Sequence, residues 1–376
     1  MILTINKYFN GLNSLRFFAA FFVLIHHLEQ IRFKYGMFNL KEYALFNNGG
    51  LAVSFFFVLS GFLISYRLIV EKKKIGTIHI RKFYIRRILR IWPLYFLLVV
   101  IGTLILPYFI MVFNIDYTMP YHFRDVIFYY IFFSPFLVNM FFGNNLLEPL
   151  WSIGVEEIFY LIWAPLAKYL NFSMFKISVC VIIIKFLILQ IVLLFENNEL
   201  FLNLLKILSF ESMSIGAIGA FIVFNLKTDV SQHILFSKKI QLLIYSLIIF
   251  RFLGFYLLEQ HFVFSENNLF FIQLFYNFLF LWLIVNISLN SKSLINLNYV
   301  WLNKLGDISY GIYMYHMLAI FFVILIFKHD LNQMNKFLSS ISIYGLVISI
   351  TILLSFLSKR YFEDYFLLAK KHFNPK

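Results

Sequence analysis

Long apolar runs limit what this chain can fold into more than any other feature. Runs able to cross about 30 Å of hydrocarbon, at 1.5 Å per residue, recur along all 376 residues. After a first run over 17–28, they lie near 50–70, 91–113, 125–143, 151–170, 177–195, 200–225, 240–258, 269–289, 305–327 and 341–358. A soluble core would interrupt such runs with charge, so we expect an all-α, polytopic membrane protein.

The composition agrees with a membrane solvent. Hydrophobic residues make up 61% of the chain and charged residues only 13%, against roughly 25% charged in soluble domains. The net charge of +14 would suggest a nucleic-acid partner in a soluble protein. Here the basic residues cluster between apolar runs, which indicates contact with membrane lipids and no nucleic-acid binding.

The charged loops predict the orientation in the membrane. Basic stretches should face the cytoplasm, and they lie at 71–90, 168–176, 227–239, 292–304 and 359–376. The loops near 196–199 and 259–266 are acidic instead. Counting crossings from both ends leaves room for one crossing between 114–124 outside and 168–176 inside.

Two runs, 125–143 and 151–170, compete for that single crossing. The first contains Ser134 followed by Pro135, which breaks or kinks a helix. We therefore predict that 125–143 is re-entrant or interfacial. About ten true crossings result, with both termini cytoplasmic and a single membrane domain over 1–376.

Ionisable residues inside apolar runs are costly and tend to be functional. His27 lies eleven residues after Arg16, about 16 Å along a helix that enters from the cytoplasm. Trp151 begins a helix that enters from the outer face and carries Glu156 and Glu157 about one to two turns below that surface, so their depth should match that of His27. A histidine beside a carboxylate can remove a proton from a hydroxyl; the alternative is a buried ion pair that only joins two helices.

Other motifs allow both a functional and a structural interpretation. Arg86, Arg87 and Arg90 precede a membrane helix, where they could bind phosphate or anchor the helix among lipid head groups. The small residues around Ser60 could admit a ligand, although close helix packing is the simpler explanation.

The remaining polar residues in apolar runs do not indicate a particular function. Lys206, Glu211 and Arg251 could pair with one another or line an acceptor cavity, and Lys185 has no evident local partner. Cys180 is the single cysteine, so it excludes a multi-cysteine metal site, and we expect it to fill the core. No metal site is predicted.

Five motifs together resemble the membrane-bound acyltransferase 3 family. Arg16 and His27 match its Arg-x10-His pair, and residues 56–62 match Phe-Phe-x-Leu-Ser-Gly-Phe. Further matches are 86–95 to Arg-Arg-x-x-Arg-Ile-x-Pro-x-Tyr, 151–160 to Trp-Ser-Leu-x-Val-Glu-x-x-Phe-Tyr with Ile153 in place of Leu, and 309–316 to Ser-Tyr-x-x-Tyr-x-x-His. Each motif alone is weak, but their order and spacing together are specific.

The resemblance implies a fold and a reaction. Family members are ten-helix proteins with cytoplasmic termini, so we expect a multi-pass protein of the bacterial inner membrane. They move an acyl group, usually acetyl, from cytoplasmic acyl-coenzyme A to a hydroxyl outside. The implied acceptor is a surface glycan such as lipopolysaccharide O-antigen, capsule or another lipid-linked sugar, with acetyl-CoA as donor and no permanently bound cofactor.

The resemblance also implies roles for particular residues. His27 is the expected general base, assisted by Glu156, although an acyl-histidine relay is the mechanistic alternative. The expected donor-binding residues are Arg16, Ser60, Arg86, Arg87, Arg90 and Tyr95.

The main alternative function is a transporter or flippase, since intramembrane charges and broken helices also mark substrate pathways. No clear inverted repeat supports it. The chain ends soon after its last apolar run, so we expect no appended extracytoplasmic domain.

Overall fold

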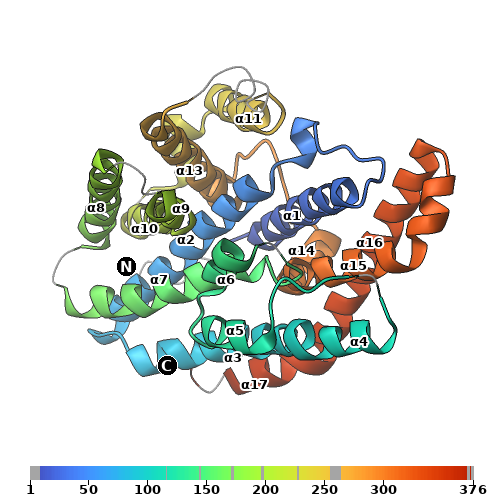
Figure 1. Cartoon of the computed structure of the whole chain (residues 1–376). Coiled ribbons are helices and arrows are strands. Elements are labelled where there is room, and N and C mark those ends of the chain that lie inside the picture. The colour runs from blue at the N-terminus through green and yellow to red at the C-terminus, as the bar shows by residue number, and fades with distance from the viewer. Residues whose placement is uncertain are drawn as a thin grey trace. The chain divides into compact units, whose positions relative to one another are not determined.

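The structure is a computed structural model, which describes residues 9–115, 117–143, 145–170, 173–195, 199–226, 228–254, 264–370 and 373. Within these ranges the chain forms helices and no strand, as Figure 1 shows. The prediction of an all-α fold is therefore confirmed.

Eight helical stretches in the described ranges are long and apolar enough to cross a membrane. They are α2 (Gly49–Ile75), α3 to α4 (Ile80–Val112), α7 (Leu150–Tyr169), α8 (Met174–Leu194), α9 to α10 (Glu199–Asn225), α13 (Glu266–Leu289), α15 (Ser309–Gln333) and α16 to α17 (Lys336–Lys370). These helices confirm a polytopic membrane protein.

Two further helices decide whether the number of crossings is ten. Helix α1 (Leu12–Lys34) has 23 residues but carries Arg16, His26 and His27, which lower its mean hydropathy. Helix α11 (Lys238–Leu253) has 16 residues, and 255–263 lie outside the described residues. Ten crossings therefore stay a prediction.

The segment predicted to be re-entrant is broken where Pro135 indicates. Helix α5 (Phe123–Ile131) and helix α6 (Pro135–Phe142) have nine and eight residues, too short to cross hydrocarbon. Phe133, between them, has a φ of 54°, in the left-handed region that non-glycine residues rarely occupy. Gly154 of α7 accommodates this break, since a Cβ there would lie 2.5 Å from the carbonyl oxygen of Phe133.

The contacts divide the chain into two compact units. The first comprises Met1–Glu29, Leu40–Ile78 and Leu166–Ser309, and holds most of α1 together with α2, α8, α9, α10, α11, α13 and α14 (Val300–Asp307). The second comprises Gln30–Asn39, His79–Pro165 and Tyr310–Lys376, and holds α3, α4, α5, α6, most of α7, α15, α16 and α17. The single domain over 1–376 stays a prediction.

Helices α2 and α10 of the first unit pack backbone against backbone. A Cβ on Gly61 would lie 2.0 Å from the carbonyl oxygen of Met213, and one on Gly216 would lie 2.1 Å from that of Val58. Contacts this short leave no space for a side chain. Gly61, next to Ser60, therefore serves helix packing, whereas donor binding by Ser60 stays a prediction.

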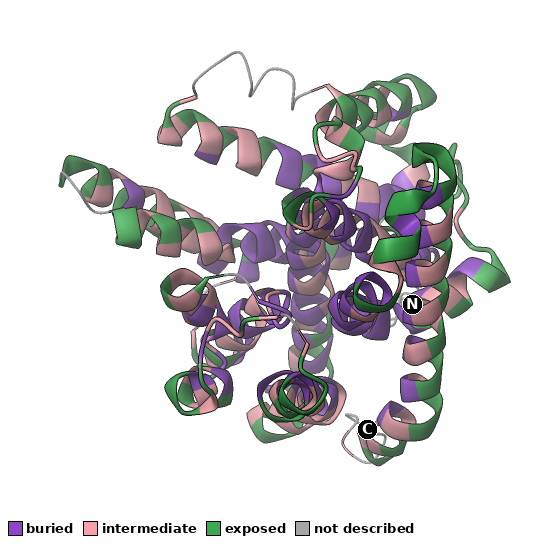
Figure 2. Ribbon diagram, turned by 45° about the vertical axis from the view of Figure 1, so that its right-hand side comes forward, coloured by how far each residue is buried: buried purple, intermediate pink, exposed green. Residues whose placement is uncertain are grey.

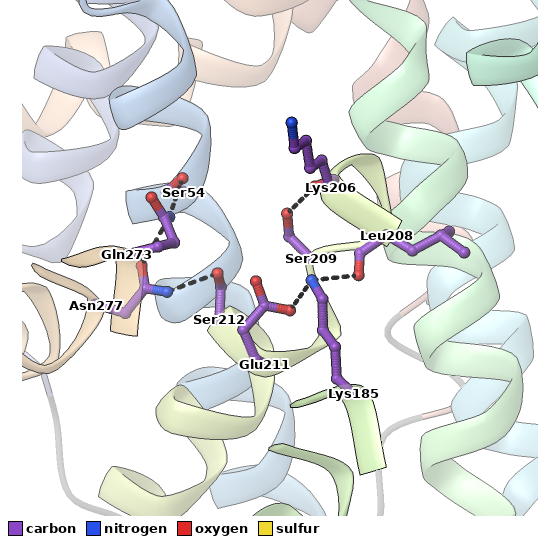
Figure 3. A network of polar contacts seen from close by, with 9 residues as sticks. All are labelled: Ser54, Lys185, Lys206, Leu208, Ser209, Glu211, Ser212, Gln273 and Asn277. Carbon is purple, nitrogen blue, oxygen red and sulfur yellow. Dashed lines mark hydrogen bonds and ion pairs between the residues drawn. The ribbon is translucent and has the colours of Figure 1, made fainter. Parts of the chain in front are cut away.

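A break in the same unit separates α9 (Glu199–Ile207) from α10 (Phe210–Asn225). The Nζ atom of Lys185, on α8, donates a hydrogen bond to the carbonyl oxygen of Leu208 at 3.0 Å and pairs with Glu211, as Figure 3 shows. A cation thus meets the carbonyl end of α9 and a carboxylate sits in the first turn of α10, as the helix dipoles favour.

The intramembrane charges find partners other than those predicted. Lys206 pairs with Glu266 at 2.8 Å, and the guanidinium of Arg251 lies 5.5 Å from the ring centre of Tyr276. The prediction that Lys206, Glu211 and Arg251 pair with one another is wrong, because each finds its contact on a different helix far away in the sequence.

Apolar surface faces outward on several helices, as expected of a protein solvated by lipid. Figure 2 shows exposed and buried residues on opposite sides of single helices. On α8 the exposed positions include Ile183, Leu187 and Leu194. Cys180 is also exposed on α8, so the prediction that it fills the core is wrong.

Candidate active site

The predicted base, His27, lies on α1 with its tautomer constrained by the helix. Its Nδ1 atom lies 3.0 Å from the carbonyl oxygen of Val23, one turn earlier. A carbonyl oxygen can only accept a hydrogen bond, so this contact requires the proton on Nδ1. In the neutral imidazole the lone pair is then on Nε2. The local geometry favours the tautomer whose Nε2 can accept a proton.

The neighbouring His26 joins α1 to the start of α2. Its imidazole lies against Gly49 and its ring centre is 5.3 Å from that of His27. Ser60 lies eleven residues after Gly49 on α2, about 16 Å along the axis at 1.5 Å per residue. His27 and Ser60 therefore lie on two helices in contact, but Ser60 is about 16 Å along α2 from the contact at Gly49.

Arg16 lies near the start of α1, eleven residues before His27. Its Nη1 atom donates to Oδ1 of Asn13 at 2.8 Å, and Nδ2 of Asn13 donates to Oδ1 of Asp307 at 2.7 Å. The close approach needs Gly306, where a Cβ would lie 2.1 Å from the carbonyl oxygen of Asn13. A polar chain thus holds the Arg16 side chain at the first turn of the helix.

The arginine row, which consists of Arg86, Arg87 and Arg90, lies on α3 in the second unit. Arg86 and Arg87 are buried. Nη1 of Arg86 donates to the carbonyl oxygen of Phe373 at 2.8 Å. The guanidinium carbon of Arg87 lies 5.9 Å from the ring centre of Phe83 and 5.8 Å from that of Tyr160. Arg90 is half-buried one turn further on.

Tyr95 follows the arginines on α3 and is fully buried. Its hydroxyl donates to the carbonyl oxygen of Tyr130 at 3.0 Å, and its ring stacks on Phe133 with centres 4.6 Å apart. These contacts fix α3 to the broken segment between α5 and α6. Donor binding by Tyr95 stays a prediction.

The two carboxylates of α7 have different partners in the second unit. Oε2 of Glu156 accepts a hydrogen bond from the hydroxyl of Tyr160 at 2.6 Å. Oε2 of Glu157 accepts one from Nε1 of Trp92, on α3, at 3.1 Å. Its other oxygen, Oε1, is buried without a hydrogen-bond partner among the described residues.

Helix α15 brings the last motif to α7 and α3. The hydroxyl of Tyr313 lies 2.7 Å from Oγ of Ser152 and donates to the carbonyl oxygen of Pro149 at 3.0 Å. The hydroxyl of Tyr310 donates to the carbonyl oxygen of Ile91 at 3.0 Å. Three motifs that are far apart in the sequence thus form one hydrogen-bonded cluster.

The predicted site residues therefore fall into two groups. Arg16, Ser60 and His27 belong to the first unit; Arg86, Arg87, Arg90, Tyr95 and Glu156 belong to the second. The prediction missed the partners Trp92 and Tyr160, which bind the two carboxylates. Tyr160 is a named residue of its motif, which was a usable signal, whereas Trp92 stands at an unspecified motif position and gave none.

These features define a class of protein: a helical membrane protein that holds a histidine of fixed tautomer and a cluster of arginines, carboxylates and tyrosines. The family model of the acyltransferase domain, acyltransferase 3, matches residues 9–360. The chain belongs to this family.

Several curated proteins are similar over part of their length. O-acetyltransferase OatA of Staphylococcus aureus is 29% identical over 252 residues, covering 62% of this chain and 38% of its own. The putative peptidoglycan O-acetyltransferase YrhL of Bacillus subtilis is 30% identical over 165 residues, covering 42% of this chain and 23% of its own. Peptidoglycan O-acetyltransferase OatA of Listeria monocytogenes is 28% identical over 160 residues, covering 42% and 24%.

The chain spans less than two fifths of the length of these relatives. No solved structure matches it.

Proposed function

We propose that the protein is a membrane O-acetyltransferase that moves an acetyl group from acetyl-coenzyme A to a hydroxyl of an extracytoplasmic glycan. The observation that carries the proposal is the contact between Nδ1 of His27 and the carbonyl oxygen of Val23, which leaves Nε2 as the basic nitrogen. Membership of the acyltransferase 3 family and the names of the relatives support the reaction class.

The proposed reaction is a direct transfer with His27 as general base. The acceptor hydroxyl oxygen attacks the thioester carbonyl carbon while its proton passes to Nε2 of His27. The carbon–sulfur bond then breaks, and the proton on Nε2 goes to the departing thiolate. Coenzyme A leaves as a thiol, the glycan leaves as an ester, and the histidine returns to its starting state. A base of this kind contributes about 10²- to 10⁴-fold to rate.

Glu156 is proposed to assist His27. A carboxylate can stabilise the imidazolium that forms during transfer. In the second unit this carboxylate holds a hydrogen bond from Tyr160, so its side chain has one orientation. If the two residues act together, removing both costs no more than removing His27 alone, as in other residue sets that act as a unit.

The donor is proposed to bind through its phosphates to the arginine row and through its pantetheine arm near Arg16 and Ser60. Arg86 and Arg87 already contact Phe373 and Tyr160, so phosphate binding there requires exchange of these contacts. Arg90 is half-buried and is the better first contact for a phosphate. Arg90→Ala should therefore weaken binding of coenzyme A more than Arg86→Ala. If both variants bind coenzyme A as tightly as the wild type, the arginine row anchors the helix among lipid head groups instead.

The acceptor is proposed to be a glycan outside the cytoplasmic membrane, which the protein crosses with both termini inside. The names of two relatives give peptidoglycan as the acceptor of those proteins. Lipopolysaccharide O-antigen and capsule stay as alternatives from the motif resemblance. Mass spectrometry and NMR of surface glycans from cells with and without the protein distinguish these acceptors by the sugar that loses its acetyl group.

Reconstitution tests the reaction itself. Purified protein in liposomes receives acetyl-coenzyme A labelled in its acetyl group, and a glycan acceptor is enclosed or added outside. We expect ester-linked label on the glycan only when donor and acceptor are on opposite sides. Label that crosses the membrane without forming an ester would favour a transporter and contradict the proposal.

A further inference from the structure

An apolar cavity of about 300 Å³ lies in the first unit, between α1, α2, α11 and α13. It is open along one side, where the lining residue Ile249 is 56% exposed. Helix α1 contributes Leu15, Phe18, Ala19 and Phe22 to its wall, at the spacing of one helix face. Seven residues separate Leu15 from Phe22, so the cavity follows the helix axis for about 10 Å. This length and uniform lining suit one hydrocarbon chain.

Hydrogen-bonded loop residues close one end of the cavity. Ile295 and Leu297 line this end. The carbonyl oxygen of Leu297 accepts from Oγ of Ser14 at 2.7 Å, and the nitrogen of Leu294 donates to Oε1 of Gln241 at 2.8 Å. In the predicted orientation this is the cytoplasmic end, so a chain from the inner leaflet would have to displace these bonds.

Among the described residues that line the cavity, Tyr245 alone has a polar side-chain atom, and that atom is hydrogen-bonded. The hydroxyl of Tyr245 accepts a hydrogen bond from Nδ2 of Asn286 at 2.8 Å. The described lining residues can therefore make only apolar contacts with a bound molecule. A sugar or a coenzyme A arm would lose its hydrogen bonds to water there without replacement.

Polar groups gather at the opposite end. Phe22 and Phe252, whose ring centres are 5.0 Å apart, form that end of the wall. The carbonyl oxygen of Phe252 accepts from Nδ2 of Asn48 at 2.8 Å, and His26 follows Phe22 by one helical turn on the same face. The cavity therefore runs from an apolar end covered by loop residues to a rim beside His26, whose ring centre lies 5.3 Å from that of the proposed base, His27.

We propose that this cavity holds the hydrocarbon chain of a lipid-linked glycan acceptor, with the sugar at the rim near His27. The inference rests on the proposed function, whose substrate class it names. A tail seated along Leu15 to Phe22 places its head group at the depth of the histidines. It also explains why an apolar cavity on α1 ends at the only two histidines of that helix.

Cavity-filling substitutions test the site by acceptor preference. Ala19→Phe and Ala52→Phe each put a ring into the cavity, since both residues line it and are buried. The ratio of kcat/KM for a polyprenyl-phosphate-linked disaccharide to kcat/KM for the free disaccharide should fall at least tenfold. The control Leu243→Phe adds the same ring on α11 at a position that is 59% exposed and outside the cavity, and should leave the ratio unchanged. An unchanged ratio in the folded Ala19 and Ala52 variants overturns the proposal.

Photo-crosslinking tests occupancy without relying on catalysis. The polyprenyl-linked disaccharide carries a diazirine in its chain, and the labelled peptides are found by mass spectrometry. We expect label on the α1 and α11 segments around Phe22 and Phe252, and loss of that label in Ala19→Phe. Equal labelling by a diazirine phosphatidylglycerol, with no preference for the glycan, would identify an ordinary lipid site and overturn the proposal. Labelling with no acetyl transfer to any acceptor would leave this site supported and contradict the proposed function instead.

Discussion

The imidazole of His26 and the backbone of Gly49 touch so closely that a Cβ on the glycine would lie 2.4 Å from Cδ2 of the ring. The start of α2 thereby fixes the part of α1 that carries both histidines. Positioning of the proposed base thus depends on a residue with no side chain.

Gly49→Ala should lower activity by displacing the histidines of α1, while the protein still folds. The new methyl group must push the His26 ring away, and a displacement of about 1 Å near a reacting group can cost about 10²-fold in rate. Gly50→Ala is the matched control, because nothing lies within 4 Å of its Cβ position. Turnover of both purified variants is the measurement; equal turnover would show that the contact does not position the site.

The packing of α2 on α10 predicts a stability effect without a direct effect on chemistry. Gly61→Ala drives a methyl group into the backbone of Met213, and overpacking of this kind costs about 1–3 kcal/mol. Gly345→Ala on α16 has no atom within 4 Å of its Cβ position and should not destabilise the protein. Thermal unfolding in detergent compares the two variants, and a wild-type Tm for Gly61→Ala would contradict the close packing.

The ion pair of Lys185 and Glu211 at the break between α9 and α10 predicts that removing one partner lowers the free energy of unfolding far more than removing both. The side chains of Lys185 and Glu211 are 12% and 4% exposed. Lys185→Met leaves a buried carboxylate without its cation, which costs about 3–5 kcal/mol, and adding Glu211→Leu should recover much of this loss.

The exposed pair of Lys206 and Glu266 is the control for that experiment, with side chains that are 47% and 26% exposed. Lys206→Met should cost less than about 1 kcal/mol, because water screens exposed pairs. Chemical unfolding of the wild type and of these three variants is the measurement. Similar losses for Lys185→Met and Lys206→Met would mean that the break does not depend on the buried pair.

Glu148 predicts a pH dependence of stability. It lies in the turn before α7, and burial raises its pKa from 4.5 to about 7, although the charge of Lys34 opposes this shift. Between pH 4.5 and 7 the folded protein binds a proton that the unfolded chain has released, so this group's contribution to stability falls as pH rises through that window.

Glu148→Gln should remove that contribution, so its Tm should exceed the wild-type Tm more at pH 8 than at pH 5. Glu42→Gln removes an exposed carboxyl and serves as the control. Parallel Tm curves for wild type and Glu148→Gln across this range would contradict the assignment.

The sequence predicted the features that depend on local composition. Apolar runs located the long helices, and Pro135 located the break between α5 and α6 because proline cannot continue a helix. The break at Leu208 and Ser209 was missed. There Lys185, on another helix, donates a hydrogen bond to the carbonyl oxygen of Leu208, and sequence spacing does not show such a contact.

The sequence predicted which residues share a helix in the candidate site, but it did not predict which side chains they contact. Spacing placed Arg16 and His27 on one helix, as the structure confirms. The different surroundings of Glu156 and Glu157 depend on Tyr160 and Trp92, and the second of these comes from a helix 65 residues away. Periodicity indicates which residues share a helix, but contacts between helices need the packed structure.

The central claim is that Nε2 of His27 accepts the proton of the acceptor hydroxyl. Transfer of labelled acetyl from acetyl-coenzyme A to glycan in liposomes, compared between wild type and His27→Ala at equal amounts of folded protein, tests it most directly. We predict that kcat falls by about 10²- to 10⁴-fold while coenzyme A still binds. Transfer by His27→Ala at close to the wild-type rate would contradict the claim.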